Sequence, residues 1–434
     1  MNRIAITAVT ATLLAGTSAH AGGLDRSGQS ISPLFNAPGT ASFGLSYVKP
    51  DLRGEDVDGD GSYDAGESYT TYTFSYADQI TDRFSYAVIA DQPFGADIFY
   101  DDDPASSNIG GTLADINSDA LSLVGRYKIN ERFSVIGGLR AQNAGGEVAL
   151  RGQSYANAIT ARAVADQTGL TAEQVGGVAQ AIGAVQAAGG NPAVLTPEQQ
   201  ALIAQVGGFA AAGAIARSFL NGRTAFDDGN GYAVDIEDSW GLGYTLGFAY
   251  EIPDIALRLA VTWNSEVSHS GTATESVAGM TSRNTIDFET PESINVEFQT
   301  GVAEDTLLLA SLRYTDWDDF DVIPPVFGVD LADIDDSYRW SLGVARRFTP
   351  EFVGIANLTY EKDNGSETVS PLGPTDGQIG LSLAGRYTSG NLNVTGGINY
   401  TKVGSAFAGV ADSPVAEFND SSAVGIGLQV QYKF

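Results

Sequence analysis

The chain ends in Gly425-Ile426-Gly427-Leu428-Gln429-Val430-Gln431-Tyr432-Lys433-Phe434. Successive side chains of an extended strand point to opposite faces. One face of this segment is therefore apolar, with Ile426, Leu428, Val430, Tyr432 and Phe434, and the other carries glycines, glutamines and Lys433. This alternation, ending in a C-terminal aromatic residue, is typical of the closing strand of a bacterial outer-membrane β-barrel.

The N-terminus predicts the same compartment. A short basic start, Met1-Asn2-Arg3, precedes an apolar stretch over 4–16, and Ala19-His20-Ala21 has the A-x-A form of a cleavage site. These are the three parts of a secretory signal peptide, here residues 1–21. A membrane-anchoring helix is the weaker alternative, because the apolar run is short and no stop-transfer flank follows it.

Composition excludes several classes of protein. After the signal, no run of 18 apolar residues occurs, so no helical membrane span is expected. The 434 residues include no cysteine, which excludes disulfides and thiolate chemistry. A net charge of −30 predicts no nucleic acid partner, since the phosphate backbone would be repelled.

Segments of weak alternation between turn residues predict fourteen strands. An even number fits a closed antiparallel transmembrane barrel over residues 41–434, preceded by an N-terminal arm over 22–40. The expected strands are 41–51, 68–79, 83–92, 117–129, 133–150, 232–251, 255–268, 284–301, 305–317, 337–348, 352–363, 377–388, 391–402 and 422–434.

The connections between these strands alternate in length. Two or three residues join the strands at one end, and the long connections at the other are 52–67, 93–116, 151–231, 269–283, 318–336, 364–376 and 403–421. Outer-membrane barrels have short periplasmic turns and long external loops. Both chain ends are therefore expected on the periplasmic side of a monomeric barrel surrounded by outer-membrane lipid and lipopolysaccharide.

Two segments resemble a known family. Thr290-Pro291-Glu292-Ser293 is followed by Tyr314-Thr315-x-Trp317-x-x-Phe320. Together with the arm and the strand count, they resemble the FadL family, outer-membrane transporters of long-chain fatty acids and, in some branches, of aromatic hydrocarbons. The resemblance covers nearly the whole mature chain and implies passive uptake of a fatty acid or another hydrophobic molecule.

The resemblance also implies a route. In that family the ligand binds an external groove and then a pocket in the barrel, an N-terminal hatch plugs the lumen, and a kink in the third strand opens a lateral exit. Here Pro93-Phe94-Gly95 interrupts the third strand. Proline removes a ladder donor and glycine permits a bend, so these residues are either this kink and gate or simply the start of an external loop. The arm is short for such a hatch, and its signature appears only as Asn36-Ala37-Pro38, so a shorter or rearranged plug is expected.

The Ala-rich insertion 151–231 predicts helices outside the barrel. Capping boxes at Thr171-x-x-Gln174 and Thr196-x-x-Gln199 start helices near 172–188 and 197–221. Leu202, Val206 and Phe209 lie on an apolar stripe of the second helix. This stripe is either the external groove where an acyl chain first binds or the surface by which two helices cover each other.

The first long loop carries a calcium-binding pattern. Residues 56–67 match the twelve positions of an EF-hand loop, with a glycine at position 6. We expect a structural Ca²⁺, and the alternative is a solvated acidic turn. The expected ligands are Asp56, Asp58, Asp60, Ser62, Asp64 and Glu67.

Four arginines fall at inward strand positions: Arg126, Arg258, Arg313 and Arg386. Guanidinium groups suit a carboxylate, so one or two could bind a fatty-acid head group, while ion pairs that brace the wall are the stronger alternative. Two other functions are alternatives to a transporter. A diffusion porin conflicts with the arm and the apolar insertion, and a Ser–His hydrolase rests only on His269, placed beside serines at the edge of an external loop. An enzyme is therefore not expected.

Overall fold

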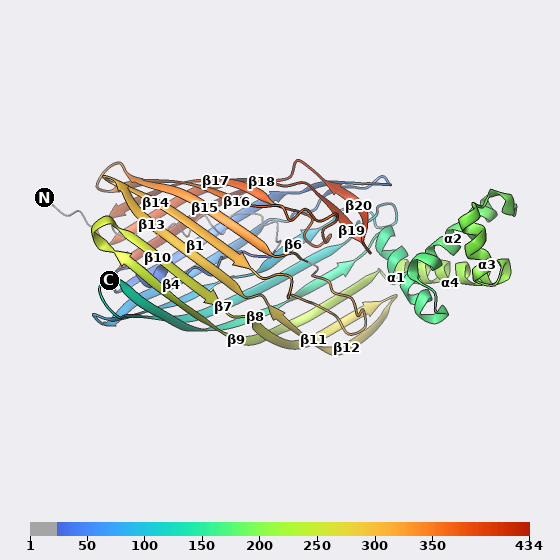
Figure 1. Cartoon of the computed structure of the whole chain (residues 1–434), viewed down its shortest axis with the longest axis horizontal. Coiled ribbons are helices and arrows are strands. Elements are labelled where there is room, and N and C mark those ends of the chain that lie inside the picture. Colours follow the sequence, from blue (N-terminus) through green and yellow to red (C-terminus); the bar gives the residue numbers. More distant parts are fainter. Residues whose placement is uncertain (1–23, 333) are drawn as a thin grey trace.

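The computed structural model describes residues 24–332 and 334–434, which form a long barrel of antiparallel strands with a helical projection at one end (Figure 1). The predicted signal peptide lies outside the described residues. The C-terminus lies at the end of the barrel opposite the helices (Figure 1). This arrangement agrees with short turns at one end and long connections at the other.

Seventeen hydrogen-bonded strands make up the barrel sheet. Three passes across the wall are each interrupted and so consist of two strands (β5 and β6, β10 and β11, β12 and β13), which leaves the fourteen passes that the sequence predicts. The strands are β1 (Thr40–Asp51), β4 (Tyr69–Thr81), β5 (Phe84–Asp91), β6 (Gly95–Phe99), β7 (Leu113–Lys128), β8 (Phe133–Leu150), β9 (Tyr232–Ile252), β10 (Leu257–Asn264), β11 (Val267–Val277), β12 (Met280–Thr290), β13 (Ser293–Ala303), β14 (Thr306–Thr315), β15 (Ser337–Arg347), β16 (Phe352–Glu361), β17 (Gln378–Ser389), β18 (Leu392–Val403) and β21 (Ser422–Lys433).

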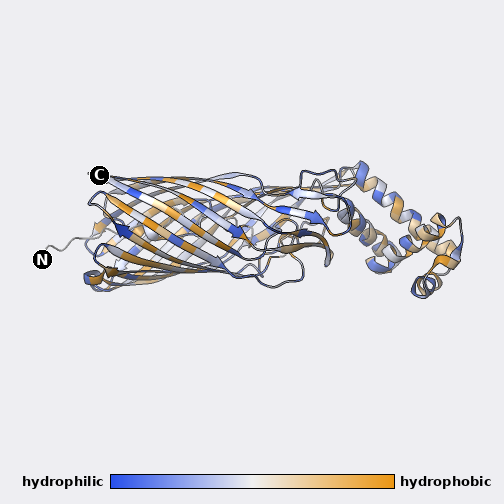
Figure 2. Ribbon diagram, turned by 90° about the horizontal axis from the view of Figure 1, so that it is seen from above, coloured by the Kyte–Doolittle hydropathy of each residue, from blue (hydrophilic) through white to orange (hydrophobic). Residues whose placement is uncertain are grey.

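The C-terminal stretch closes the barrel, as predicted. β21 pairs with β18 on one side and with β1 on the other, where Leu428 lies opposite Leu45 and Ile426 opposite Tyr47. These apolar side chains are about half exposed on the outer surface, whereas Gly425 is buried. This pairing closes the sheet at the seam between its first and last strands, and a membrane-spanning sheet requires such closure because unpaired backbone groups cannot face lipid. The same alternation of apolar and polar residues runs along the other strands (Figure 2).

The prediction of an external connection over 269–283 is wrong. These residues extend the wall as the hairpin β11–β12, with a turn at Ala278-Gly279 where both residues have positive φ. Serines, threonines and a glycine made the segment look like a loop. Its inward positions, however, include buried Ala273 and Glu275, so the period of two continues beyond the predicted strand end.

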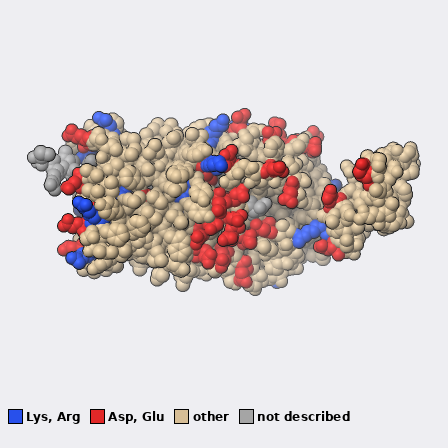
Figure 3. Space-filling view, viewed as in Figure 1, with Lys and Arg blue, Asp and Glu red and all other residues tan. Residues whose placement is uncertain are grey.

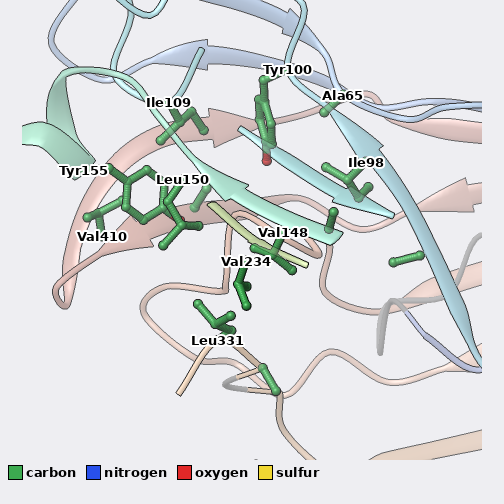
Figure 4. Packing of buried hydrophobic residues seen from close by; sticks show 14 of the residues in the cluster. Ala65, Ile98, Tyr100, Ile109, Val148, Leu150, Tyr155, Val234, Leu331 and Val410 are labelled. Atoms are coloured by element: carbon green, nitrogen blue, oxygen red, sulfur yellow. The ribbon is translucent and has the colours of Figure 1, made fainter. Parts of the chain in front are cut away.

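A second, four-stranded sheet caps the outer end of the barrel. It consists of β2 (Arg53–Asp56), β3 (Ser62–Asp64), β19 (Ala406–Val410) and β20 (Ser413–Phe418). Phe418 is fully buried and lies edge-on to Tyr100, with ring centroids 6.1 Å apart. Figure 4 shows part of the apolar core in this outer half, to which Tyr100, Val148 and Leu331 contribute from different elements.

The insertion contains more helices than predicted: α1 (Gln153–Thr168), α2 (Ala172–Ala187), α3 (Pro197–Gln205) and α4 (Phe209–Asp228), with a short 3₁₀ helix at Pro192–Val194. Two further 3₁₀ helices lie outside it, at Ser32–Phe35 in the arm and at Pro253–Ile255 in the turn between β9 and β10. Both capping boxes are present. The predicted second helix breaks at Gly207-Gly208, where both residues have positive φ. Within the described residues no single helix is long and apolar enough to cross a membrane; α3 and α4 pass that test only together, and they are bent by 92°.

Candidate functional site

A cavity of about 180 Å³ lies inside the outer half of the barrel. We call it the outer cavity. Its floor includes Leu24 of the arm and Phe94, and its roof includes Trp317 and Phe320. Strands β6, β7, β8, β9 and β12 supply apolar walls such as Ile116. It is a concave apolar site, which is the ordinary form of a small-molecule pocket.

The loop 316–336 folds inward as a lid over this cavity. Trp317 lies edge-on to Phe94 at 5.4 Å and to Phe320 at 5.6 Å between ring centroids. The carboxylate of buried Glu275 accepts hydrogen bonds from the backbone N–H groups of Val326 and Phe327, which fastens the lid to β11. This lid was not predicted from the sequence. Its signal was the run of apolar residues, from Phe320 to Leu331, interspersed among the acidic ones.

The arm fills the barrel below the outer cavity. Asp25 accepts hydrogen bonds at 2.6 and 3.1 Å from the guanidinium of Arg313, and both side chains are buried. Ser30 donates to Glu297. Ile31 and Leu34 pack against inward-facing alanines of the wall. The short arm predicted from the sequence is therefore a plug held by buried charges and apolar contacts.

The four predicted arginines all project from the wall into the barrel, but none lines the outer cavity. Arg313 binds the arm, and Arg126 pairs with Glu251. Arg126 and Arg258 also lie over the ring of Phe35 at 4.7 and 4.2 Å. Arg386 is half-buried, and its Nε has no hydrogen-bond partner among the described residues. A head-group role for these residues stays a prediction.

The third wall pass is interrupted where the sequence predicts. β5 ends at Asp91 and β6 begins at Gly95, so Pro93 and Phe94 lie in the break. The arm pairs with this break: Arg26 N–H donates to the Pro93 carbonyl and Gly95 N–H to the Leu24 carbonyl, both at 2.8 Å. Backbone groups that the break removes from the ladder thus find partners in the plug.

The break leaves a gap in the wall between β4 and the third pass. Their pairing ends at Phe74 opposite Ala90. Beyond it, residues 69–73 of β4 pair with β1 on one edge and, within the described chain, with no strand on the other. The gap closes again at the Gly66–Ile98 bridge. A cavity of about 70 Å³, the wall cavity, lies beside this gap, where Thr71 and Gln92 line it.

Arg26 lines the wall cavity and lies two residues along the arm from Leu24, which lines the outer cavity. The Arg26 guanidinium donates to the Gly95 carbonyl at 3.0 Å and pairs with Asp97. It also lies over the Tyr69 ring, 4.3 Å from its centroid. Ser27, on the other side of Arg26, also lines the wall cavity. A third cavity, about 130 Å³ and lined by Arg258 and Arg313, lies on the other side of the arm.

The predicted external groove residues lie away from this site. Leu202 and Val206 pack against the apolar core between α2, α3 and α4, and Phe209 is 48 % exposed. The helices thus cover much of each other's apolar surface, while they project beyond the barrel (Figure 1). None of the three residues lines the outer cavity.

The EF-hand pattern does not form a ready calcium site. Asp56 accepts hydrogen bonds from Tyr63 OH and from the N–H groups of Gly61 and Asn108. Asp64 accepts from the Leu52 N–H. Among the residues described, no three or more acidic or histidine side chains are grouped as a metal would require. Calcium binding stays a prediction, and it needs Asp56 to exchange its partners.

Comparison with known proteins decides the family. The family model described as "Outer membrane protein transport protein (OMPP1/FadL/TodX)" matches residues 30–434. The chain belongs to the OMPP1/FadL/TodX family. Comparison with curated protein sequences gives no match.

Solved structures share the fold of this family member at low sequence identity. A FadL homologue from Pseudomonas aeruginosa superimposes with a TM-score of 0.65 at 14 % identity, covering 99 % of each chain. The toluene transporter TodX of Pseudomonas putida gives 0.57 at 14 % identity, over 96 % of this chain and 98 % of that one. The monoaromatic hydrocarbon channel CymD gives 0.53 at 14 % identity, over 98 % and 99 %.

Members of the OMPP1/FadL/TodX family are outer-membrane transport channels for hydrophobic compounds, not enzymes. His269, the residue on which the hydrolase alternative rested, does not lie at the edge of an external loop as predicted. His269 is buried in β11, where its ring stacks on Phe288 and its Nδ1 lies 3.0 Å from the Ser239 carbonyl oxygen. It packs within the barrel rather than at a loop edge.

Proposed function

We propose that this protein takes up small hydrophobic molecules passively, through the outer cavity and then sideways through the gap between β4 and the third wall pass. The observation that carries the proposal is the position of Arg26. Its guanidinium joins the arm to Gly95 and Asp97, beside the backbone hydrogen bonds that the arm makes with Pro93 and Gly95. A small movement of the arm would connect the two cavities.

The arm favours this route over an axial one. Buried Asp25 is bound to Arg313 on β14 and also lies 3.4 Å from Arg339, the residue opposite Arg313 on the neighbouring strand β15. Breaking such pairs without a replacement costs about 3–5 kcal/mol. A diffusion porin needs an open lumen, which this plug does not leave. Lateral release needs only local rearrangement next to the wall.

The size of the outer cavity bears on the substrate. Its volume of about 180 Å³ is close to that of cavities of roughly 150 Å³ that hold a benzene molecule. A single-ring compound would fit whole. A long-chain fatty acid, expected from the family resemblance, would place only part of its acyl chain there.

Filling the cavity tests the proposal. Ala114 on β7 lines the outer cavity, so Ala114→Phe should occupy part of its volume. Leu381→Phe on the outer surface of β17 is the matched control. With radiolabelled toluene as probe, uptake by cells that display the protein should fall at least severalfold for the first variant and stay at the wild-type rate for the second. Equal uptake by both variants would contradict the proposal, and so would a steady open-channel conductance of wild-type protein in planar bilayers.

A further inference from the structure

The charged residues that line the outer cavity are all acidic. No lining residue is lysine, arginine or histidine, and two, Asp335 and Asp376, are acidic. Moving a carboxylate from water into such a cavity removes its hydration without supplying a cation. The two lining carboxylates would add repulsion.

These two carboxylates are fixed in place by one loop. Asp376 accepts hydrogen bonds from the N–H groups of Asn364 and Gly365, at 2.8 and 3.2 Å. Asp335 accepts from the Ser366 hydroxyl at 2.5 Å. Their partners are neutral, so the negative charge is held at the cavity without an ion pair in these contacts.

The surroundings strengthen the negative field. Acidic side chains gather in one patch near the outer ends of the strands (Figure 3). Partial burial, together with the charges of Asp336 and Asp319, raises the pKa of Asp316 above its ordinary value. A concave site surrounded by one sign of charge repels ligands of that sign before they bind.

The buried guanidinium groups cannot offset this field for a ligand in the cavity. Arg26 is paired with Asp97 and Arg313 with Asp25. Both belong to the plug contacts below the cavity floor and are absent from its lining. An anion in the outer cavity would therefore lie next to the two carboxylates, whereas these arginines are farther away and already paired.

We propose that the outer cavity selects uncharged hydrophobic ligands and discriminates against carboxylate anions, with Asp335 and Asp376 as the discriminating residues. The substrate class is then a neutral compound of single-ring size, a hydrocarbon or its alcohol, rather than a fatty-acid anion. This inference rests on the proposed function, because it concerns the same cavity.

The test compares two probes that share a ring and differ in charge, benzyl alcohol and benzoate. Their dissociation constants are measured at pH 7 by calorimetry on the full-length protein in nanodiscs. We expect benzoate to bind about tenfold more weakly or worse, as a repulsion of 1.4 kcal/mol or more implies. The gap between the two probes should narrow as salt concentration rises, because screening weakens the repulsion.

Variants assign the effect to residues. Asp335→Asn and Asp376→Asn should each lower the ratio of the benzoate to the benzyl alcohol dissociation constant severalfold. Glu304→Gln, an exposed acid in the short turn between β13 and β14 and outside the cavity lining, should leave the ratio unchanged. The salt series uses the wild-type protein, so it tests the charge discrimination even when a variant fails to fold.

The outcomes separate the two proposals. If both probes bind equally at low salt, the charge selection is wrong and the proposed function stands. If neither probe binds, the outer cavity is not a ligand site and the proposed function falls with the inference. If the probes differ but the ratio is insensitive to salt and to both substitutions, discrimination has another cause and the inference is overturned.

Discussion

Arg26 Nε donates a hydrogen bond of 3.0 Å to the carbonyl oxygen of Gly95, so the plug of this barrel is fastened at the point where the third wall pass is broken. Gly95 is the residue that permits this contact. A Cβ at this position would lie 2.4 Å from Arg26 Cζ. The plug and the break between β5 and β6 are therefore one structural unit. A substitution in either of them should alter the structure of the other.

Removing the Arg26 side chain should loosen this unit. Arg26→Ala leaves Asp97 without its cation and removes the hydrogen bond to the Gly95 carbonyl. We expect a lower unfolding midpoint and more frequent transient openings in planar-bilayer recordings. Arg26→Lys, which keeps a charge for Asp97 but lacks the planar fork, should lie between wild type and alanine. A wild-type recording from the alanine variant would show that Arg26 does not hold the plug.

A methyl group on Gly95 should have a similar effect from the wall side. In Gly95→Ala the new Cβ must displace the Arg26 guanidinium. Gly396→Ala is the matched control, since the nearest atom to its Cβ is a carbonyl oxygen 4.0 Å away. We expect the conductance of Gly95→Ala to exceed that of the wild type, and the conductance of Gly396→Ala to equal it. Identical traces for both would mean that the guanidinium can shift without consequence.

The buried pair between Asp25 and Arg313 should dominate the stability of the plug. Asp25→Asn leaves Arg313 buried without its carboxylate, which typically costs about 3–5 kcal/mol. Faster cleavage of the arm by an added protease is the expected readout, together with a lower urea midpoint in detergent. Asp51→Asn, which breaks the exposed pair with Arg53, should change neither measurement. Equal effects of the two substitutions would contradict this account of the plug.

Calcium binding by residues 56–67 can be tested by calorimetric titration. Because Asp56 must exchange its hydrogen bonds from Tyr63 and two backbone N–H groups, we expect weak binding, with a dissociation constant of about 10⁻⁴–10⁻³ M. Tyr63→Phe removes one competing donor and should tighten binding. Absence of heat for both proteins at millimolar calcium would refute the calcium prediction.

The strand positions could be predicted because each residue of a barrel strand faces either outward or inward. That rule held to within a few residues even for β9, and it failed mainly at 269–283, where small polar residues hid the continued alternation. Helix α1 was not predicted because its N-cap residue is Gly152, which has no side chain to cap it, whereas Thr171 and Thr196 cap the starts of α2 and α3.

The site was harder to predict than the wall. Pro93 and Gly95 mark the break because proline and glycine disturb a ladder locally. The partners of that break, Arg26 on the arm and Trp317 on the lid, come from distant parts of the chain, and no local pattern pairs them. The inward arginines could be placed on a face, but only the folded arm shows that Arg313 is occupied by Asp25.

A reversible crosslink across the wall gap tests the lateral route most directly. The chain has no cysteine, so Tyr72→Cys with Gln92→Cys places the only two thiols on either side of the gap, where Gln92 Oε1 now accepts from Tyr72 N–H at 3.1 Å. Phe74→Cys with Ala90→Cys, a pair already joined in the ladder, is the control. Bridging the first pair with a short reducible crosslinker should abolish toluene uptake until a reductant is added, and bridging the control pair should leave uptake unchanged. Full uptake with the gap bridged would contradict lateral release.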